Sequence, residues 1–214
     1  MKICLFTGNK PRHTAMALAL MNAGHEVMAI INPKPAVMDH PYWRRMRDAE
    51  WDIFSLSSTF YCPVMVSFET SWLLHAFDRA VVFSGPFLTG DFFRDLPPAL
   101  NLHAGIAPEY RGSACNFWAE YDKHPELVGA QVQRLGQRLD GGEILAEVVA
   151  TDDDPFMRGM HAVQLGIKAM VKQLEISPDQ WKPIRPNDPA QTIRYSRKAD
   201  LTPEILAEYM ARLK

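Results

Sequence analysis

The sequence predicts an α/β fold: a Rossmann-like, mostly parallel sheet flanked by helices, with a small C-terminal extension. Residues 2–31 read as strand, helix and strand, which is the βαβ unit from which parallel sheets are built. Further short apolar runs at 79–84 and 99–103 are bounded by turn residues, as buried strands are. The composition, 47% hydrophobic and 22% charged residues, is typical of an ordinary globular protein.

The first half of the chain supplies most of this sheet. Residues 2–6 form a strand, and the helix after it places Ala17, Leu20 and Met21 on one face until Gly24 ends it. A second strand covers 26–31. A short surface helix at 42–47, a candidate third strand at 52–56 and an amphipathic helix at 65–76 follow. With strands at 79–84 and 99–103, we expect a parallel sheet from residue 2 to residue 103.

The second half has a different pattern. Strands at 129–135 and 143–149 are joined by a loop containing Gly141 and Gly142, and a long helix carries an apolar stripe from 160 to 174. Asp154 and Pro155 suit the N-cap and the first turn of that helix. The remaining residues are proline-rich and end in a short helix opened by Thr202. We expect one main domain over residues 1–176 and a C-terminal extension over 177–214.

Charge and patterning exclude several classes of protein. The chain has 214 residues and a net charge of −2, which argues against a nucleic-acid binder that relies on a large basic patch. No apolar run approaches the roughly 20 residues of a membrane span, and the first strand turns too early for a signal peptide. The cysteines Cys4, Cys62 and Cys115 are widely spaced, as expected in a reducing compartment. We expect a cytoplasmic protein.

Common catalytic and metal-binding motifs are missing from the sequence. It contains no Cys-x-x-Cys or His-x-x-x-His, so we expect no metal site. Without Gly-x-Gly-x-x-Gly or a P-loop, a nicotinamide or ATP site is poorly supported. The absence of Gly-x-Ser-x-Gly argues against a serine hydrolase.

The loop after the first strand is a candidate anion site. Lys10, Arg12 and His13 lie where a helix begins, and there backbone N–H groups and the helix dipole favour a negative group. A phosphate or carboxylate of a substrate would fit. An ordinary turn with solvated Lys10 and Arg12 explains the same residues.

The strand at 99–103 carries the most informative pair. Asn101 and His103 are two residues apart, so they point to the same face of the sheet. They lie at the carboxyl end of the strand, where parallel α/β sheets place their sites. An amide and an imidazole there suit a developing oxyanion and a proton in transit. On these two residues alone, a structural role stays open.

Three blocks in register resemble the folate-dependent formyltransferases, the family of glycinamide ribonucleotide, methionyl-tRNA and sugar N-formyltransferases. The blocks are Asn101-x-His103, then Pro108-x-Tyr110-Arg111-Gly112, then Leu139-Asp140-Gly141-Gly142, and they fall in the family's order and spacing. The resemblance is clear from residue 79 to 149. One departure is Ala104-Gly105, where the family has Pro-Ser after the histidine.

The resemblance implies a catalytic domain over residues 1–176 that uses 10-formyltetrahydrofolate as co-substrate and no metal. It implies the catalytic residues Asn101, His103 and Asp140. The residues expected to bind the folate are Gly85, Pro86, Phe87, Leu88, Leu139, Gly141 and Gly142. Those expected to bind the acceptor are Lys10, Arg12, His13, Tyr110, Arg111 and Gly112.

The resemblance further implies transfer of a formyl group to a primary amine, with a nucleotide-linked amino sugar favoured. The runs 110–118 and 195–202 look more like that branch. The alternatives are glycinamide ribonucleotide formyltransferase, a 10-formyltetrahydrofolate hydrolase and a non-catalytic folate or nucleotide binder. The tRNA enzyme, which has an additional C-terminal domain, is expected to need a longer chain. The expected partners are the amine and folate, with no nucleic acid and no membrane, and a homodimer is compatible with the sequence.

Overall fold

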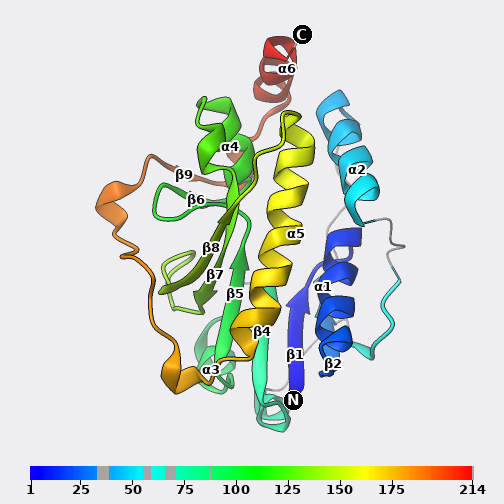
Figure 1. Cartoon of the computed structure of the whole chain (residues 1–214), viewed down its shortest axis with the longest axis vertical. Coiled ribbons are helices and arrows are strands. Elements are labelled where there is room, and N and C mark those ends of the chain that lie inside the picture. Colours follow the sequence, from blue (N-terminus) through cyan, green and yellow to red (C-terminus); the bar gives the residue numbers. More distant parts are fainter. Residues whose placement is uncertain (33–38, 55–58, 66–70, 87, 214) are drawn as a thin grey trace.

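A computed structural model describes residues 1–32, 39–54, 59–65, 71–86 and 88–213. Its centre is a seven-stranded sheet in the order β3-β2-β1-β4-β5-β7-β8 (Figure 1). The strands are β1 (Lys2–Thr7), β2 (Glu26–Ile31), β3 (Val64–Met65), β4 (Arg79–Phe83), β5 (Ala99–His103), β7 (Gly129–Arg134) and β8 (Ile144–Val149). A separate two-stranded sheet pairs β6 (Tyr110–Gly112) with β9 (Arg194–Ser196).

The expected parallel sheet is confirmed over the first half of the chain. β1 pairs in parallel with β2 and β4, and β4 pairs in parallel with β5. β7 and β8 then run antiparallel to their neighbours. The carboxyl ends of β1, β4 and β5 therefore meet at one edge of the sheet. This is the edge at which the sequence predicted a site.

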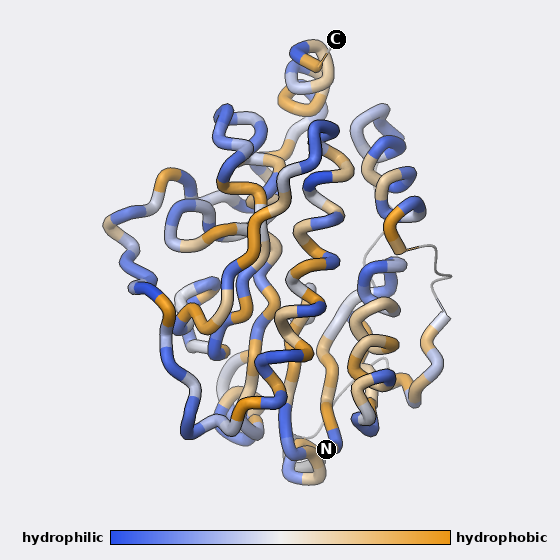
Figure 2. The backbone as a smooth tube through the Cα atoms, viewed as in Figure 1, coloured by the Kyte–Doolittle hydropathy of each residue, from blue (hydrophilic) through white to orange (hydrophobic). Residues whose placement is uncertain are grey.

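One face of the sheet is covered by the long helices α1 (Pro11–Asn22) and α5 (Pro155–Leu174), against which α2 (Pro41–Phe54) packs, and Figure 1 shows α5 running along the sheet. Buried residues of these helices form the main core with Leu5, Leu100 and Val132 of the strands. A smaller cluster covers the other face, with Leu74 of η1 (Ser71–Ala76) and Phe92 of α3 (Gly90–Arg94) against Phe6. Figure 2 shows that the central strands are predominantly hydrophobic.

Three expected elements differ from the structure. Residues 52–54 belong to the end of α2, not to a third strand, and residues 55 and 56 lie outside the described part of the chain. α2 is amphipathic over its whole length and buries Tyr42, Ala49 and Phe54, which a short surface helix would not do. The expected helix at 65–76 is divided: Met65 ends β3, the 3₁₀ helix η1 begins at Ser71, and 66–70 are outside the described residues.

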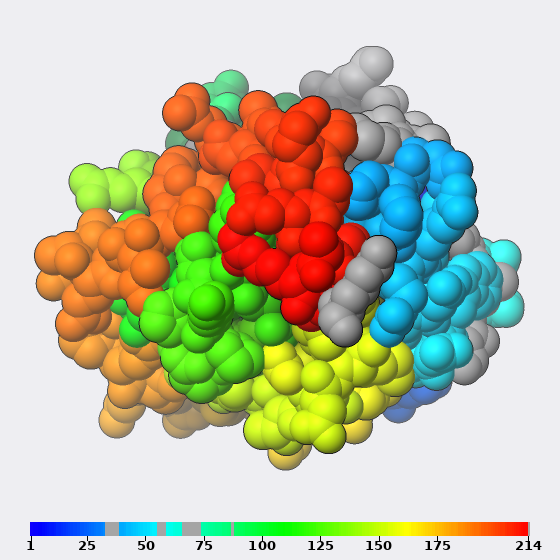
Figure 3. Space-filling model, turned by 90° about the horizontal axis from the view of Figure 1, so that it is seen from above, coloured from blue at the N-terminus to red at the C-terminus, as the bar shows by residue number. Residues whose placement is uncertain are grey.

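The second half follows the sequence pattern closely. The side chain of Asp154 accepts hydrogen bonds from the N–H groups of Phe156 and Met157, so it caps α5 as expected. The short helices α4 (Cys115–Tyr121) and α6 (Pro203–Arg212) lie at one end of the molecule. Figure 3 shows α6 seated beside α4, α5 and α2, and Tyr209 makes edge contacts with Tyr42 and Phe117.

Candidate active site

The alternation of β5 fixes the direction of the candidate catalytic side chains. Leu100 and Leu102 point into the main core beneath α5, where Leu102 lies close to Gly166. Asn101 and His103 therefore share the opposite face. Across the antiparallel ladder, Asn101 is opposite Gln133 and His103 is opposite Gln131. The end of β5 is thus a polar patch in an otherwise apolar sheet.

His103 and Asp140 form a buried ion pair, with 3.0 Å between Nδ1 and Oδ1. Both side chains are more than nine-tenths buried. Burial by itself lowers the pKa of His103, but the Asp140 carboxylate and the Cys115 sulfur more than offset it, and the pKa lies well above 6.5. Burial raises the pKa of Asp140, and His103, the Gly112 N–H and Arg111 bring it below 3.8. The pair is therefore an imidazolium and a carboxylate near neutral pH.

The loop that presents Asp140 is held by several hydrogen bonds. Asp140 has a φ of +49°, a left-handed conformation that a non-glycine residue rarely adopts. Its Oδ2 accepts from the Gly112 N–H at 2.8 Å, and its backbone oxygen accepts from Arg111 Nη2 at 3.0 Å. Asn187 Nδ2 donates to that same oxygen at 2.9 Å. These bonds hold the carboxylate toward His103.

The Tyr-Arg-Gly block lies beside this pair. The Tyr110 backbone oxygen is 3.1 Å from His103 Nε2, while the tyrosine ring is buried. Arg111 is also mostly buried, and its guanidinium contacts the Asp140 loop. Gly112 has a φ of +93°, and a Cβ there would lie 2.0 Å from the Ser196 oxygen on β9. In the described contacts this block supports the His103–Asp140 pair, and its expected contact with an acceptor stays a prediction.

Gly105, where the sequence departs from the family pattern, lies against the side chain of Cys115. A Cβ at Gly105 would lie 2.3 Å from the Cys115 Cβ and 2.8 Å from His103 Nε2. The thiol of Cys115 therefore occupies the space beside the imidazole that a side chain at position 105 would need. A serine at 105, as in the family pattern, would require this wall of the site to move.

The first loop lies apart from the His103–Asp140 pair in the described contacts. Arg12 Nη1 pairs with Glu50 Oε1 of α2 at 2.8 Å. His13 is fully buried, its Nδ1 accepts from the Lys10 N–H at 2.8 Å, and a Cβ at Gly8 would collide with its ring. Two of the three residues expected to bind an anion are thus engaged within the protein. Acceptor binding at Lys10, Arg12 and His13 stays a prediction.

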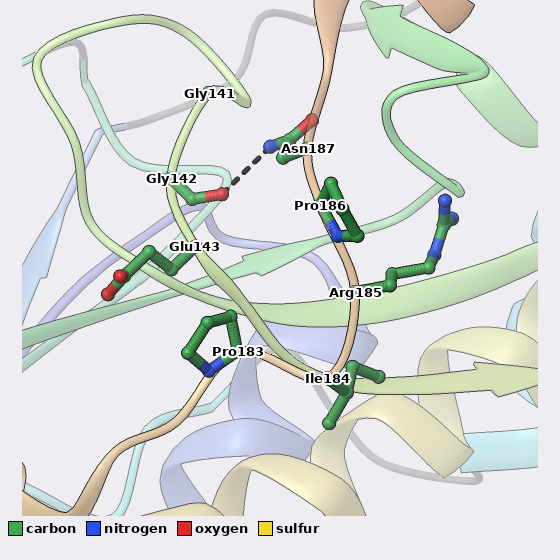
Figure 4. A pocket seen from close by; sticks show the side chains of 8 residues that line it. All are labelled: Gly141, Gly142, Glu143, Pro183, Ile184, Arg185, Pro186 and Asn187. Atoms are coloured by element: carbon green, nitrogen blue, oxygen red, sulfur yellow. Dashed lines mark hydrogen bonds between the residues drawn. The ribbon is translucent and has the colours of Figure 1, made fainter.

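The residues expected to bind folate come from two places. Gly85, Pro86 and Leu88 follow β4, which neighbours β5, and Phe87 lies outside the described residues. Leu139 is exposed, while Gly141 and Gly142 line a cavity of about 530 Å³ together with Glu143 and residues 183–187 (Figure 4). The C-terminal segment therefore forms one wall of the cavity beside Asp140.

Sequence reasoning missed a polar network behind the site. Gln131, fully buried on β7, exchanges two hydrogen bonds with the backbone of Ala107 and donates to Glu147 at 2.7 Å. Arg185 then joins Glu147 to Glu109. The sequence signal for this network was the presence of Gln131 and Gln133 at alternate positions of a buried strand. No sequence signal marked Arg185 and Asn187, because their partners are 38 or more residues away in the chain.

Within the described residues, no group of three or more His, Cys, Asp or Glu side chains is arranged to hold a metal ion. No described helix combines the length and apolar character needed to cross a membrane.

Known proteins share this architecture. A solved sugar N-formyltransferase from a Shewanella species superposes with a TM-score of 0.62 over 94% of this chain and 78% of its own, at 12% identity. Phosphoribosylglycinamide formyltransferase from Anaplasma phagocytophilum gives 0.57 over 83% and 86%, at 17% identity. The N-formyltransferase from Helicobacter canadensis, solved with folinic acid and dTDP-3-aminofucose, gives 0.61 over 94% and 71%, at 12% identity.

In sequence, the chain is 27% identical over 171 residues to a methionyl-tRNA formyltransferase from Pelotomaculum thermopropionicum, covering 74% of this chain and 53% of that protein. The resemblance to the folate-dependent formyltransferases is confirmed. The chain spans about half the length of the curated formyltransferases it matches, and no protein-family model matches it. The solved formyltransferases, at these identities, establish the shared fold and leave the acceptor open.

Proposed function

We propose that this chain transfers a formyl group from 10-formyltetrahydrofolate to a primary amine of a small molecule. The observation that carries the proposal is the buried His103–Asp140 ion pair at the carboxyl end of β5, on a fold shared with formyltransferases. An imidazolium is costly to bury, and it is useful where negative charge develops on a reacting oxygen.

The roles follow from the positions of the side chains. Attack of an amine on the formyl carbon puts negative charge on the formyl oxygen, and the Asn101 amide and the His103 imidazolium are donors on one face of β5. The bond from the formyl carbon to N10 of the folate then breaks, tetrahydrofolate leaves, and the proton lost by the amine is taken up by that nitrogen. Asp140 keeps His103 charged and in a fixed orientation. His103 Nε2 faces the Tyr110 backbone oxygen, so binding of the formyl oxygen requires that donor to be shared or redirected.

The residues present fit a folate co-substrate. The cavity of about 530 Å³ lies beside Asp140, and its volume is within the range of small-molecule sites. When bound, 10-formyltetrahydrofolate supplies an activated formyl group. Gly141 and Gly142 line this cavity, and we propose that they hold the folate together with Leu139 and with Gly85, Pro86, Phe87 and Leu88, which follow β4 in the sequence.

For the acceptor we propose a nucleotide-linked amino sugar, supported by the runs 110–118 and 195–202 and by the Helicobacter neighbour that was solved with such a nucleotide sugar. Methionyl-tRNA is a second candidate, favoured by the curated relatives. Glycinamide ribonucleotide, hydrolysis to formate and folate binding without turnover are the remaining alternatives.

The test follows the loss of formyl group from 10-formyltetrahydrofolate with each acceptor. We expect turnover with a dTDP-linked amino sugar and none with His103→Ala. Turnover only with glycinamide ribonucleotide or charged tRNA would reject the amino sugar. Formate release without any amine would indicate a hydrolase, and folate binding without turnover would reject catalysis.

A further inference from the structure

Asn187 connects the C-terminal segment to the loop of Asp140. Its Nδ2 donates to the backbone oxygens of Asp140, at 2.9 Å, and Gly142, at 2.8 Å. Its Oδ1 accepts from Arg111 Nη2 at 3.3 Å. Figure 4 shows the side chain pointing from the C-terminal segment toward the Gly141–Gly142 turn, with the bond to Gly142 dashed. The Asn187 amide therefore donates to the Asp140 loop through its nitrogen and accepts from Arg111 through its oxygen.

The turn that Asn187 holds contains a residue in the left-handed conformation. Asp140 has a φ of +49°, which costs an L-residue free energy that the surrounding contacts must offset. Arg111 donates to the same Asp140 oxygen and is itself oriented by Asn187. If the amide is removed, two backbone oxygens and the Arg111 guanidinium lose a shared partner. The loop is then free to relax toward an ordinary backbone conformation.

We propose that Asn187 is a positioning residue for the transfer reaction: it fixes the left-handed turn at Asp140, and so keeps the carboxylate in contact with His103. This rests on the function proposed above. Asn187 acts through the backbone of the loop and not through the substrate. The C-terminal segment is accordingly part of the catalytic apparatus, although its sequence carries none of the three matched blocks.

The charge state of His103 reports on this positioning. The groups that face its imidazole are Asp140 from the loop, Cys115 from α4, the Tyr110 backbone oxygen and the neutral Gln131 across the ladder. Arg111 acts on Asp140 from the other side. Asp140 is the carboxylate among them, so a displaced loop must lower the pKa of His103 toward its ordinary value.

The experiment compares Asn187→Ala and Asn187→Asp with the wild type and with Gln191→Glu, an exposed control in the same segment. The aspartate variant turns a donor into a carboxylate facing two carbonyl oxygens. We expect both variants at 187 to lower kcat about 10- to 100-fold with little change in the folate KM. We also expect the alkaline limb of the kcat profile to move to lower pH in Asn187→Ala, and the control to match the wild type.

A titration of the His103 ring proton by NMR, in the protein without substrates, gives the deciding measurement. We expect a lower pKa in Asn187→Ala with a melting temperature near the wild-type value, whereas the added carboxylate of Asn187→Asp opposes that fall. An unchanged His103 pKa together with an unchanged pH profile would overturn the positioning role. A lowered pKa in a protein that transfers no formyl group to any amine would uphold the positioning of Asp140 and reject the proposed function.

Discussion

His103 and Asp140 are buried together at the end of β5. Substitutions of this pair can therefore be compared with substitutions of surface charges to isolate its contribution to kcat. We predict that Asn101→Ala, His103→Ala and Asp140→Ala each lower kcat at least ~100-fold, because each removes a donor or the group that charges a donor. His161→Ala is the matched control, since His161 Nδ1 pairs with Asp152 at 2.6 Å on the surface. A variant that keeps more than a tenth of wild-type turnover would lose its catalytic assignment.

The same pair predicts how stability depends on pH. His103 has a pKa raised well above 6.5, so its contribution is complete below 6.5 and is lost as pH rises through the raised value. Asp140 has a pKa lowered from 3.8, so its contribution is complete above 3.8 and is lost as pH falls through the lowered value.

We therefore expect the difference in unfolding free energy between wild type and His103→Gln to be greatest between pH 3.8 and pH 6.5. Urea denaturation across a pH series measures it. A difference that is constant with pH would show that the pair is not charged in the native state.

At the residue scale, the sequence was informative where chemistry is local. Asn101 and His103 could be placed on one face because a strand has a period of two, and Asp140 followed from the spacing of the resemblance. The support for Asp140 could not be predicted, because Asn187 reaches it across 47 residues. Nor could the left-handed backbone at Asp140, because an aspartate tolerates that conformation without requiring it.

At the scale of the element, α5 offers a matched pair of glycines. A Cβ at Gly166 would lie 2.7 Å from the Ala130 Cβ and 2.9 Å from Leu102, whereas a Cβ at Gly159 would meet nothing within 4 Å. We predict that Gly166→Ala destabilises the fold by about 1–3 kcal/mol through overpacking against β7 and β5. Gly159→Ala should stabilise it by roughly 0.5–1 kcal/mol through helix propensity. Equal shifts in melting temperature for the two variants would contradict close packing at Gly166.

A partly buried ion pair between Arg12 and Glu50 joins α1 to α2. Arg12 keeps 27% of its side chain exposed and Glu50 only 6%, so Arg12→Ala leaves a buried carboxylate without its cation. We predict a loss of about 1–3 kcal/mol, measured by urea denaturation. Arg12→Ala combined with Glu50→Gln should recover part of it. Lys10→Ala serves as the control, and a loss as large as that of Arg12→Ala would count against the pair.

Elements with a strong period were predicted well, and those shaped by tertiary contacts were not. The strands β1, β2, β4 and β5 and the capped helix α5 are nearly as expected. Residues 52–54 read as a strand from their composition, but they continue α2, whose apolar face packs against α5. β3 has only two residues, too few for alternation to reveal.

At the scale of the whole molecule, the C-terminal segment is joined to the rest of the chain by core packing, strand pairing and polar contacts. Trp181, Leu206 and Tyr209 are buried in the main core, and β9 pairs in parallel with β6. Arg194 Nη2 contacts Asp122 at 2.7 Å, and Arg185 and Asn187 reach the site. The proposed boundary at residue 176 therefore marks a change of sequence pattern across which the core continues.

This continuity predicts cooperative unfolding of the whole chain. Leu206 is fully buried, so Leu206→Ala should cost about 2–5 kcal/mol, whereas Leu213→Ala, at a half-exposed position after α6, should cost little. Because the core is shared, the loss at Leu206 should appear equally in the hydrogen-exchange protection of the slowest amides of β1 and β4. If residues 177–214 instead unfold as a separate unit, Leu206→Ala will weaken protection in α6 while β1 and β4 keep the wild-type values. Hydrogen exchange measured on both variants distinguishes these outcomes. A single core spreads the loss of stability to every strand, whereas a C-terminal extension that unfolds separately confines the loss to its own residues.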